Sequence, residues 1–393
     1  MTLTSPHRSQ NRNRNPDGPF HIVDERDYLM EIAQDMPDVI SLGLGDPDFA
    51  TPAHIVAAAT DALRDGRCAD YTDHAGLPEL RRAIAAKLAQ ENGIIADPDT
   101  EITVTTGGQE GLYVLVQAVL DPGDEILVPD PRYSSYDAAI TRAQGVMVTI
   151  PTREADDFAL DPAEVEQRIT PRTKALLLLT PSNPTAAVIP PATIHRLAEI
   201  AKAHDLLVIA DEIYEHFTYD GAVHLSIGSL PGMRERTITV NGFSKTYAMT
   251  GWRLGYVVAP VAITRAIRAI KETVSIAAPT LSQWAGVAAL TDSQECVTVM
   301  RTAYDERRRA LMQALTDVGF TYGHPYGTFY IFANTSRTQL TAFDLAVRML
   351  TEARVLIFPG TGFGADWGNY LRFSLLQPTP ILKEAIARLT RVL

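Results

Sequence analysis

The sequence predicts an α/β protein, in which a mostly parallel sheet forms a large domain and a smaller α+β domain follows it. The chain has 393 residues, which exceeds the size at which one compact core usually suffices. Short apolar, β-branched runs without polar alternation are separated by segments of helical spacing, which is typical of a parallel sheet covered by helices on both faces. From about residue 291 onward, the pattern changes to a long helix followed by short strands and helices.

The large domain is expected to span residues 50–290, and the small domain to combine residues 20–49 with 291–393. The polar residues 1–19 are expected to form a disordered tail. The predicted strands of the large domain are Glu101–Thr106, Glu125–Pro129, Val146–Ile150, Lys174–Thr180, Leu206–Ala210, Arg236–Val240 and Leu254–Ala259, with helices that include Gly111–Leu120 and Ile194–His204. In the small domain we expect a helix over Val299–Val318, strand character within Gly319–Ala333, a helix over Phe343–Ala353, strands over Val355–Phe358 and Tyr370–Leu375, and a final helix from Pro380.

The composition argues against several classes of partner. The chain carries 35 basic and 47 acidic residues, for a net charge of -12. We expect neither nucleic acid nor an anionic membrane as main partner, because both would be repelled. No apolar run approaches the roughly 18 residues that span a bilayer, and the tail lacks the apolar stretch of a secretory signal. We therefore expect a cytoplasmic protein, with a short organelle-targeting role for the tail as the alternative. Cys68 and Cys296 are isolated in the sequence, which favours reduced thiols and no metal site.

Chemically distinctive side chains follow five of the predicted strands. Because open α/β sheets bind ligands just past the carboxyl ends of their strands, we expect these side chains to converge on one edge of the sheet. The residues in question are Gly107-Gly108 at the start of a helix, Tyr133, Asn183, Asp211 with Tyr214, and Ser244-Lys245. Two arginines join them, since Arg253 is bracketed by glycines and Arg372 interrupts an apolar strand.

Each of these residues also has a structural explanation when it is taken alone. Gly107-Gly108 fits an ordinary tight turn as well as a phosphate cradle at a helix start. Asp211 fits a helix N-cap, and Lys245 fits a surface lysine. Arg253 and Arg372 fit intramolecular ion pairs as well as sites that capture an anion. Their convergence is what favours a ligand site.

The residues around Lys245 carry a specific resemblance. The segment Asn241–Tyr256, N-G-F-S-K-T-Y-A-M-T-G-W-R-L-G-Y, closely resembles the lysine segment of class I/II aminotransferases, the aspartate aminotransferase family of fold-type-I pyridoxal-phosphate enzymes. Further matching motifs follow in family order, and the resemblance covers essentially everything after the tail. They are L-G-L-G-D-P-D-F at 42–49, Y-T-D-H-A-G-L-P-E-L-R at 71–81, G-G-Q-E-G-L at 107–112, S-N-P-T at 182–185, D-E-I-Y at 211–214, P-Y-G-T-F-Y at 325–330 and L-R-F-S at 371–374.

The resemblance implies a role for each matching residue. Lys245 would bind pyridoxal 5'-phosphate as a Schiff base and move the α-proton, with Asp211 on the pyridine nitrogen. The remaining cofactor contacts are implied to be Asn183 and Tyr214 on the ring hydroxylate, Tyr133 stacked on the ring, Gly107, Gly108, Gln109, Ser244 and Arg253 at the phosphate, and Tyr71 reaching the phosphate of the neighbouring subunit of a homodimer. The substrate α-carboxylate is implied to bind Arg372, Asn183 and the backbone of Gly45.

Three residues depart from the family pattern. Many members have a hydroxyl residue where this chain has Gly242, and the family's N-P-T-G becomes Asn183-Pro184-Thr185-Ala186. Prokaryotic-type aspartate aminotransferases place a lysine for the distal substrate carboxylate where this chain has Gln109. A neutral amide repays the desolvation of a carboxylate less than an ammonium does, so we expect donors with a neutral or apolar side chain.

The expected function is a pyridoxal-phosphate-dependent aminotransferase that passes the amino group of an L-amino acid to a 2-oxo acid. The main alternative is a lyase or cyclising synthase on the same fold, because the same residues would stabilise the same carbanion. A non-catalytic regulator is a further alternative, although the tail is too short for the DNA-binding region that such proteins add. The donor preference has its own alternatives, in which Gln109 contacts only phosphate, or in which Arg132, or Lys271 or Arg26 from the partner subunit, supplies the missing cation.

Overall fold

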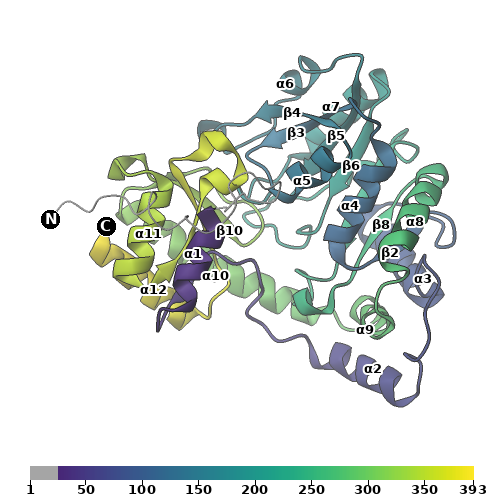
Figure 1. Cartoon of the computed structure of the whole chain (residues 1–393), viewed down its shortest axis with the longest axis horizontal. Coiled ribbons are helices and arrows are strands. Elements are labelled where there is room, and N and C mark those ends of the chain that lie inside the picture. Colours follow the sequence, from purple (N-terminus) through teal and green to yellow (C-terminus); the bar gives the residue numbers. More distant parts are fainter. Residues whose placement is uncertain (1–24) are drawn as a thin grey trace, which may run out of the picture.

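The structure, a computed structural model of the chain, describes residues 25–393. The predicted tail over residues 1–19, and the start of the predicted small domain over residues 20–24, lie outside the described residues. Figure 1 shows three helices gathered at one end of the molecule, Glu25–Gln34 (α1), Ala342–Ala353 (α11) and Thr379–Val392 (α12). The large sheet extends away from them, together with the helices Pro162–Glu166 (α6) and Pro191–Ala203 (α7). Among the described residues, no helix combines the length and the apolar character needed to cross a bilayer.

The large sheet has seven strands in the order β2-β8-β7-β6-β5-β3-β4. The strands span Ile102–Thr105 (β2), Glu125–Asp130 (β3), Val146–Pro151 (β4), Thr173–Leu179 (β5), Leu207–Asp211 (β6), Thr237–Gly242 (β7) and Gly255–Val258 (β8). All neighbouring pairs are parallel except the two that involve β8, which runs antiparallel to both β2 and β7. The predicted class, α/β with a mostly parallel sheet, is confirmed.

Both faces of the sheet are buried, which explains why its strands lack polar alternation. Ile126 and Val128 of β3 join one apolar cluster with the helices Gly107–Val119 (α4), Ser135–Arg142 (α5) and Val261–Ser275 (α8). Leu127, between them, joins the opposite cluster with Pro162–Glu166 (α6) and Pro191–Ala203 (α7). Consecutive residues of one strand therefore serve two cores.

A third apolar cluster covers the edge formed by β2 and β8. It is built by the helices Ala53–Arg64 (α2), Pro78–Lys87 (α3) and Thr280–Thr291 (α9). After Lys87 the helix continues as a π-helical segment over Leu88–Asn92 and ends at Gly93, which has a left-handed φ of 68°. A π-helical turn inserts an extra residue and changes which side chains share a face.

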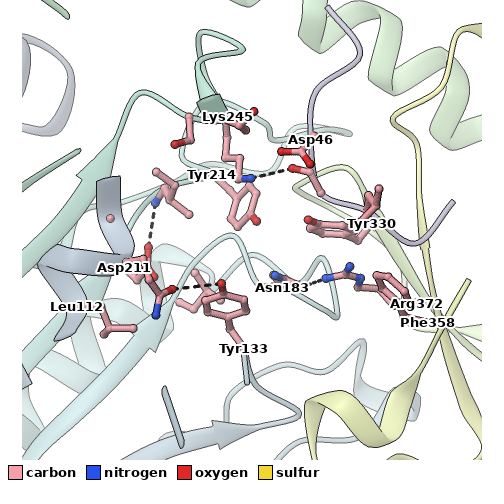
Figure 2. A pocket seen from close by; sticks show the side chains of 18 of the residues that line it. Asp46, Leu112, Tyr133, Asn183, Asp211, Tyr214, Lys245, Tyr330, Phe358 and Arg372 are labelled. Atoms are coloured by element: carbon pink, nitrogen blue, oxygen red, sulfur yellow. Dashed lines mark hydrogen bonds between the residues drawn. The ribbon is translucent and has the colours of Figure 1, made fainter. Parts of the chain in front are cut away.

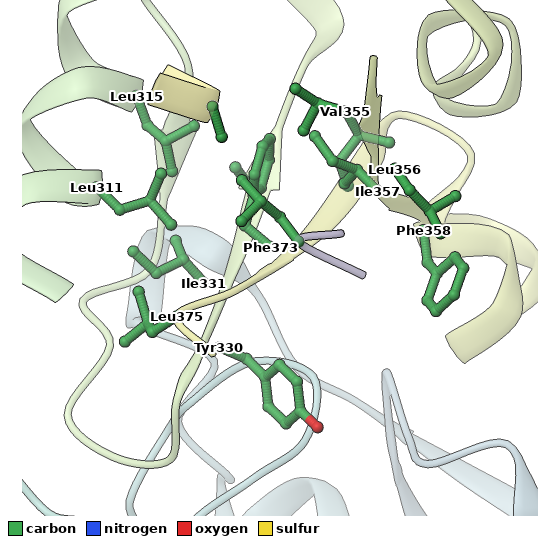
Figure 3. Packing of buried hydrophobic residues seen from close by; sticks show 14 of the residues in the cluster. Leu311, Leu315, Tyr330, Ile331, Val355, Leu356, Ile357, Phe358, Phe373 and Leu375 are labelled. Carbon is green, nitrogen blue, oxygen red and sulfur yellow. The ribbon is translucent and has the colours of Figure 1, made fainter. Parts of the chain in front are cut away.

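The second part of the fold is a four-stranded antiparallel sheet with helices packed against it. The strands follow the order β12-β13-β10-β9, and the elements span Glu295–Asp317 (α10), Thr321–Tyr322 (β9), Tyr330–Asn334 (β10), Ala342–Ala353 (α11), Phe358–Pro359 (β12), Tyr370–Ser374 (β13) and Thr379–Val392 (α12). Figure 3 shows Ile331 and Phe373 of this sheet, with Leu375 just after β13, packed between Leu311 of α10 and the segment around Leu356.

The N-terminal described segment packs onto this smaller unit. The helix Glu25–Gln34 (α1) contributes Leu29 to its apolar cluster, and the strand Ile40–Ser41 (β1) pairs in parallel with Val355–Leu356 (β11). These contacts support the proposed grouping of the segment before residue 50 with residues 291–393. They also explain one local difference from expectation. The run Val355–Phe358 was expected to be a single strand, but it divides at Ile357 because β11 pairs with β1 while β12 pairs with β13.

Candidate active site

A cavity of about 730 Å³ lies where the carboxyl ends of the parallel strands meet the smaller unit. This volume is typical of small-molecule sites, for which roughly 300–1,000 Å³ is common. The predicted site residues that line it are Gly45, Gly108, Gln109, Tyr133, Asn183, Asp211, Tyr214, Ser244, Lys245, Arg253 and Arg372. Two predicted residues do not line it. Gly107 lies just behind Gly108, and Tyr71 is 83% exposed on the connection between α2 and α3.

Lys245 projects into the cavity from the loop after β7 (Figure 2). Its Nζ donates a hydrogen bond to the carbonyl oxygen of Gly45, at 2.7 Å. Burial lowers the pKa of Lys245 to about 8, with the positive charges of Arg372 and Arg253 acting in the same direction and Asp46 opposing them. Such an amine loses its proton far more readily than an exposed lysine, as a nucleophile must.

Asp211 ends β6 with its carboxylate buried beneath the cavity. The hydroxyl of Tyr136 donates to Oδ2 at 2.9 Å, and the backbone N–H of Ile213 donates to Oδ1 at 3.3 Å. Burial raises the pKa of Asp211 to about 6, and the nearby charge of Glu212 adds to the rise. The alternative role as a helix N-cap does not apply, because turns follow Asp211 and no helix begins there.

Tyr136 was not among the predicted site residues, although it fixes one oxygen of Asp211. A local signal existed, because Tyr136 lies three residues after Tyr133, on a segment with helical spacing. The two rings meet edge-on, with centroids 5.6 Å apart. Tyr133 faces the cavity while Tyr136 is buried behind it, so the start of α5 and the residues just before it supply both a wall of the cavity and a support for the carboxylate.

The end of the cavity near α4 is suited to an anion. Gly107 has a left-handed φ of 77°, and a Cβ built on it would lie 2.6 Å from Nη2 of Arg253. Arg253 is itself left-handed, with a φ of 53°, and its Nη1 donates to the carbonyl oxygen of Thr250 at 2.9 Å. This places a guanidinium beside the N-terminus of α4, where backbone N–H groups and the helix dipole also favour negative charge.

The departure at Gly242 has a structural explanation. Gly242 is buried in β7, and a Cβ there would meet the carbonyl oxygen of Leu254 at 3.1 Å and the Cα of Gly255 at 3.2 Å. A hydroxyl side chain at this position would therefore be crowded by β8. At Ala186, in contrast, the structure would favour the glycine of the family pattern. Ala186 has a left-handed φ of 61°, which a glycine adopts without strain.

The other end of the cavity is suited to a carboxylate. Arg372 projects from β13, and its Nη1 and Nη2 donate to Oδ1 of Asn183 at 3.0 Å and to the carbonyl oxygen of Gly43 at 2.5 Å. Its Nε is buried and bonds to no described residue. The guanidinium lies 4.2 Å from the ring centroid of Tyr330 and 4.7 Å from that of Phe363. The two aromatic rings hold the guanidinium in place without neutralising its charge.

Neither arginine forms an ion pair within the described part of the chain. The ion pairs among residues 25–393 include no carboxylate on Arg253 or on Arg372. Among residues 25–393, nothing supports the alternative of an internal salt bridge for either arginine. Arg372 is buried and Arg253 is exposed. A guanidinium without a described carboxylate partner thus lies at each end of one cavity, which favours an occupant with two anionic groups.

A group of metal-ligand side chains lies behind the cavity. Atoms of Glu212, Glu215 and His224 lie within 4.8 Å of one another. The carboxylates already have other partners, since the ammonium of Lys87 contacts Glu215 and the hydroxyl of Ser226 donates to Glu212 at 2.7 Å. The expectation that the protein holds no metal stays a prediction.

The sheet topology, the lysine at the carboxyl edge and the two arginines together define a fold-type-I pyridoxal-phosphate transferase. The family model for aminotransferase class I and II matches residues 37–389. The chain belongs to this family, whose members use pyridoxal 5'-phosphate, and it is an aminotransferase.

Similar proteins cover almost the whole chain. An aspartate aminotransferase from Pyrococcus abyssi is 44% identical, over 93% of this chain and 94% of that protein. Aromatic-amino-acid aminotransferase 2 from Thermococcus litoralis is 40% identical, over 93% of this chain and 94% of that protein. The crystal structure of an aromatic aminotransferase from Pyrococcus horikoshii superposes with a TM-score of 0.88 at 44% identity, covering 93% of this chain and 98% of that one.

Proposed function

We propose that this chain binds pyridoxal 5'-phosphate through Lys245 and transfers the amino group of an L-amino acid to a 2-oxo acid in ping-pong order. The observation that carries this proposal is the pair of unneutralised arginines on either side of the lysine. Arg253 is suited to the cofactor phosphate and Arg372 to the substrate α-carboxylate. Lys245 and Asp211 line the same cavity.

The residues that line the cavity would have separate roles in catalysis. The bound cofactor supplies an electron sink that stabilises negative charge at the substrate Cα. Asp211 holds a carboxylate where the pyridine nitrogen is expected, which favours the protonated ring. The Lys245 amine, with its lowered proton affinity, takes and returns the proton at Cα. Arg372 and Asn183 fix the carboxylate, and thereby fix which bond at Cα stands perpendicular to the ring.

We further propose a donor with a neutral or apolar side chain. Relatives of similar identity are named for aspartate and for aromatic amino acids, so the donor must be argued from the cavity itself. Gln109 carries no charge, and its Oε1 accepts a hydrogen bond from the hydroxyl of Tyr133 at 3.3 Å. The cavity wall also includes Leu44 and Phe358, which favour apolar groups.

Two of the three alternative cations, Arg132 and Lys271, do not line the cavity of their own subunit. Arg132 forms a bidentate pair with Asp137, at 2.7 Å for each contact. The Lys271 side chain is buried, with Nζ donating to the carbonyl oxygen of Ile276 at 3.1 Å. Arg26 lines the cavity of its own subunit, with its guanidinium 5.9 Å from the ring centroid of Phe358. Because Arg26 is a cation in the cavity wall, a test of the donor must include it.

The reaction class is tested by its dependence on an acceptor. Purified protein with added cofactor is given a panel of amino acids, with and without 2-oxoglutarate or pyruvate. We expect multiple turnovers only when a 2-oxo acid is present, and none for Lys245→Ala. Sustained product formation without an acceptor would identify the lyase or cyclising synthase instead. Borohydride reduction and peptide mapping should place the cofactor on Lys245 rather than on any of the other five lysines.

The donor is tested by comparing kcat/KM for aspartate with kcat/KM for alanine, leucine, methionine and phenylalanine. We expect a neutral donor to lead, because a distal carboxylate would lose its water without gaining a cation. Gln109→Lys should raise aspartate turnover selectively. A tenfold or greater lead for aspartate in the wild type would contradict the proposal, and its loss in Arg26→Met would identify Arg26 as the responsible cation.

A further inference from the structure

The backbone hydrogen bonding of the sheet stops before it reaches Lys245. Strands β6 and β7 pair as far as Asp211 and Val240, and the next bond, from the N–H of Glu212 to the carbonyl oxygen of Val240 at 2.9 Å, is the last between the two segments. Tyr214 and Lys245 both lie beyond this point. The lysine segment keeps backbone bonds on its other side, such as that from the N–H of Phe243 to the carbonyl oxygen of Leu254 at 3.1 Å. Between the Tyr214 and Lys245 segments, however, the further contacts are made by side chains.

Two side-chain bonds connect the segments beyond the sheet. Nδ2 of Asn241 donates to Oε1 of Glu215 at 2.6 Å. One residue further along the first segment, Nδ1 of His216 lies 3.2 Å from Oγ1 of Thr246. Consecutive residues of the Asp211 segment thus hold the lysine segment at two points, four residues before Lys245 and one residue after it.

The carboxylate of Glu215 is itself anchored from behind. The ammonium of Lys87 contacts Oε1, and Nδ2 of Asn92 donates to Oε2 at 2.6 Å. Lys87 also donates to Oδ1 of Asn92 at 2.7 Å. These two residues are five apart, a spacing that the π-helical segment Leu88–Asn92 brings onto one face. The anchor thus extends from the α3 helix to the end of β7.

The anchor stays charged across the working pH range. Burial raises the pKa of Glu215, but Lys87, His216 and His224 outweigh burial and bring the pKa to about 2. Among the described residues, the titratable and charged groups around the Glu215 carboxylate are Lys87, Glu91, Glu212, His216, His224, Tyr247 and Tyr256. A carboxylate that is ionised and paired at all working pH values makes the same contacts throughout that range, so the contacts do not depend on pH.

We propose that Glu215 and Asn241 are positioning residues, which hold the half-buried Lys245 amine at its place in the cavity that Asp211 also lines. This inference rests on the proposed function, because it concerns the lysine that would carry the cofactor. Losing the bond between Glu215 and Asn241 should let the end of β7 move and expose the amine further to water. Burial is the largest factor that lowers the pKa of Lys245, so its proton affinity should rise when this bond is lost.

The test uses three substitutions in the cofactor-loaded protein. Asn241→Ala removes the bond to Glu215, and Thr246→Val is a milder, nearly isosteric change that removes the bond to His216. Thr237→Val is the matched control, because Thr237 lies in the same strand and its buried hydroxyl bonds to no described residue. For each variant, the midpoint of the pH titration of the cofactor's near-visible absorbance, the thermal midpoint, kcat and KM are measured.

We expect the absorbance midpoint of Asn241→Ala to rise by about one pH unit, as for a group that regains solvent, with a smaller rise for Thr246→Val. We expect kcat to fall more than KM changes in both variants, and Thr237→Val to match the wild type. Lower thermal midpoints with unchanged absorbance midpoints would show a purely structural role and overturn the inference. A wild type without any bound-cofactor absorbance would instead overturn the proposed function.

Discussion

At the residue scale, burial acts in opposite directions on the two groups that the proposed chemistry needs. It brings the pKa of the Lys245 amine down to about 8 and the pKa of the Asp211 carboxyl up to about 6. The amine is thereby made available as a base near neutral pH. The carboxylate, in contrast, is held in a place where its charge is costly until a cationic partner arrives. A protonated pyridine ring is such a partner.

Asp211→Asn should therefore stabilise the cofactor-free protein while impairing catalysis. A pKa raised from 3.8 to about 6 means that ionisation of the native carboxyl costs about 3 kcal/mol of stability above pH 6. The cost is absent below pH 3.8, where both states are protonated, and it grows as the pH rises to 6. In urea unfolding of the apoprotein, the free energy of unfolding of the variant should exceed that of the wild type by more at pH 8 than at pH 5. An equal difference at both pH values would show that Asp211 is not destabilised by its charge.

The same substitution should weaken the loaded enzyme. Loss of a charge-assisted bond to the pyridine nitrogen costs about 1.5–3 kcal/mol in the ground state, and more as negative charge develops at Cα. Half-reaction rates in single turnovers should fall by more than the cofactor affinity does. Unchanged half-reaction rates would exclude the assigned role.

How much of this site could be predicted depends on where the partner of each residue lies in the sequence. Lys245, Asp211 and Arg372 were predictable because each stands at the end of an apolar strand or interrupts one, and because their motifs resemble those of the family. Tyr136 had only the local signal of its spacing from Tyr133, and Glu215 had none, because their roles rest on contacts with residues 75 and 26 positions away. Contacts between residues so far apart in the sequence can be predicted only once the strand order is known.

At the element scale, the boundaries were harder to predict than the elements themselves. The helix expected from Gly111 begins at Gly107, where Oε2 of Glu110 accepts the backbone N–H of Thr106 at 2.6 Å. This bond satisfies one of the unpaired donors at the start of the helix. The glycines that resemble a turn in the sequence thus belong to the first turn of α4. That placement directs backbone N–H groups at the anion end of the cavity.

The approach of β8 to α4 makes Gly255 a sensitive position. A Cβ on Gly255 would lie 2.6 Å from the backbone carbon of Gly107 and from the nitrogen of Gly108. Backbone cannot rotate away as a side chain can, so Gly255→Ala should displace the start of α4. We expect the cofactor to bind at least about tenfold more weakly, because small displacements of positioning groups are costly. Gly362→Ala, where nothing lies within 4 Å, is the control in a cofactor titration, and equal affinities for the two variants would contradict this role for Gly255.

At the scale of the whole molecule, the cavity takes its walls from both parts of the fold. Asp130 of β3 accepts a hydrogen bond from the Trp367 indole at 3.1 Å, and Glu154 accepts one from the hydroxyl of Tyr370 at 2.7 Å. These bonds join the large sheet to the segment that carries Arg372. Tyr71 lies elsewhere, on the connection between α2 and α3, at the opposite end of the molecule from α11 and α12 (Figure 1). Its exposure in the single chain agrees with the proposed homodimer, in which it would reach the phosphate of the other subunit.

A mixture of two inactive variants tests this arrangement. Tyr71→Ala removes the donated phenol, and Lys245→Ala removes the lysine of the recipient site. In a hybrid dimer, the Tyr71→Ala subunit keeps its lysine and would receive Tyr71 from the Lys245→Ala subunit, so one complete site would form. Equal amounts, unfolded and refolded together, should recover about one quarter of wild-type activity, because half of the dimers are hybrids with one of two sites intact. If Tyr71 serves its own subunit, or if the protein is an active monomer by light scattering, mixing recovers nothing beyond the two variants measured separately.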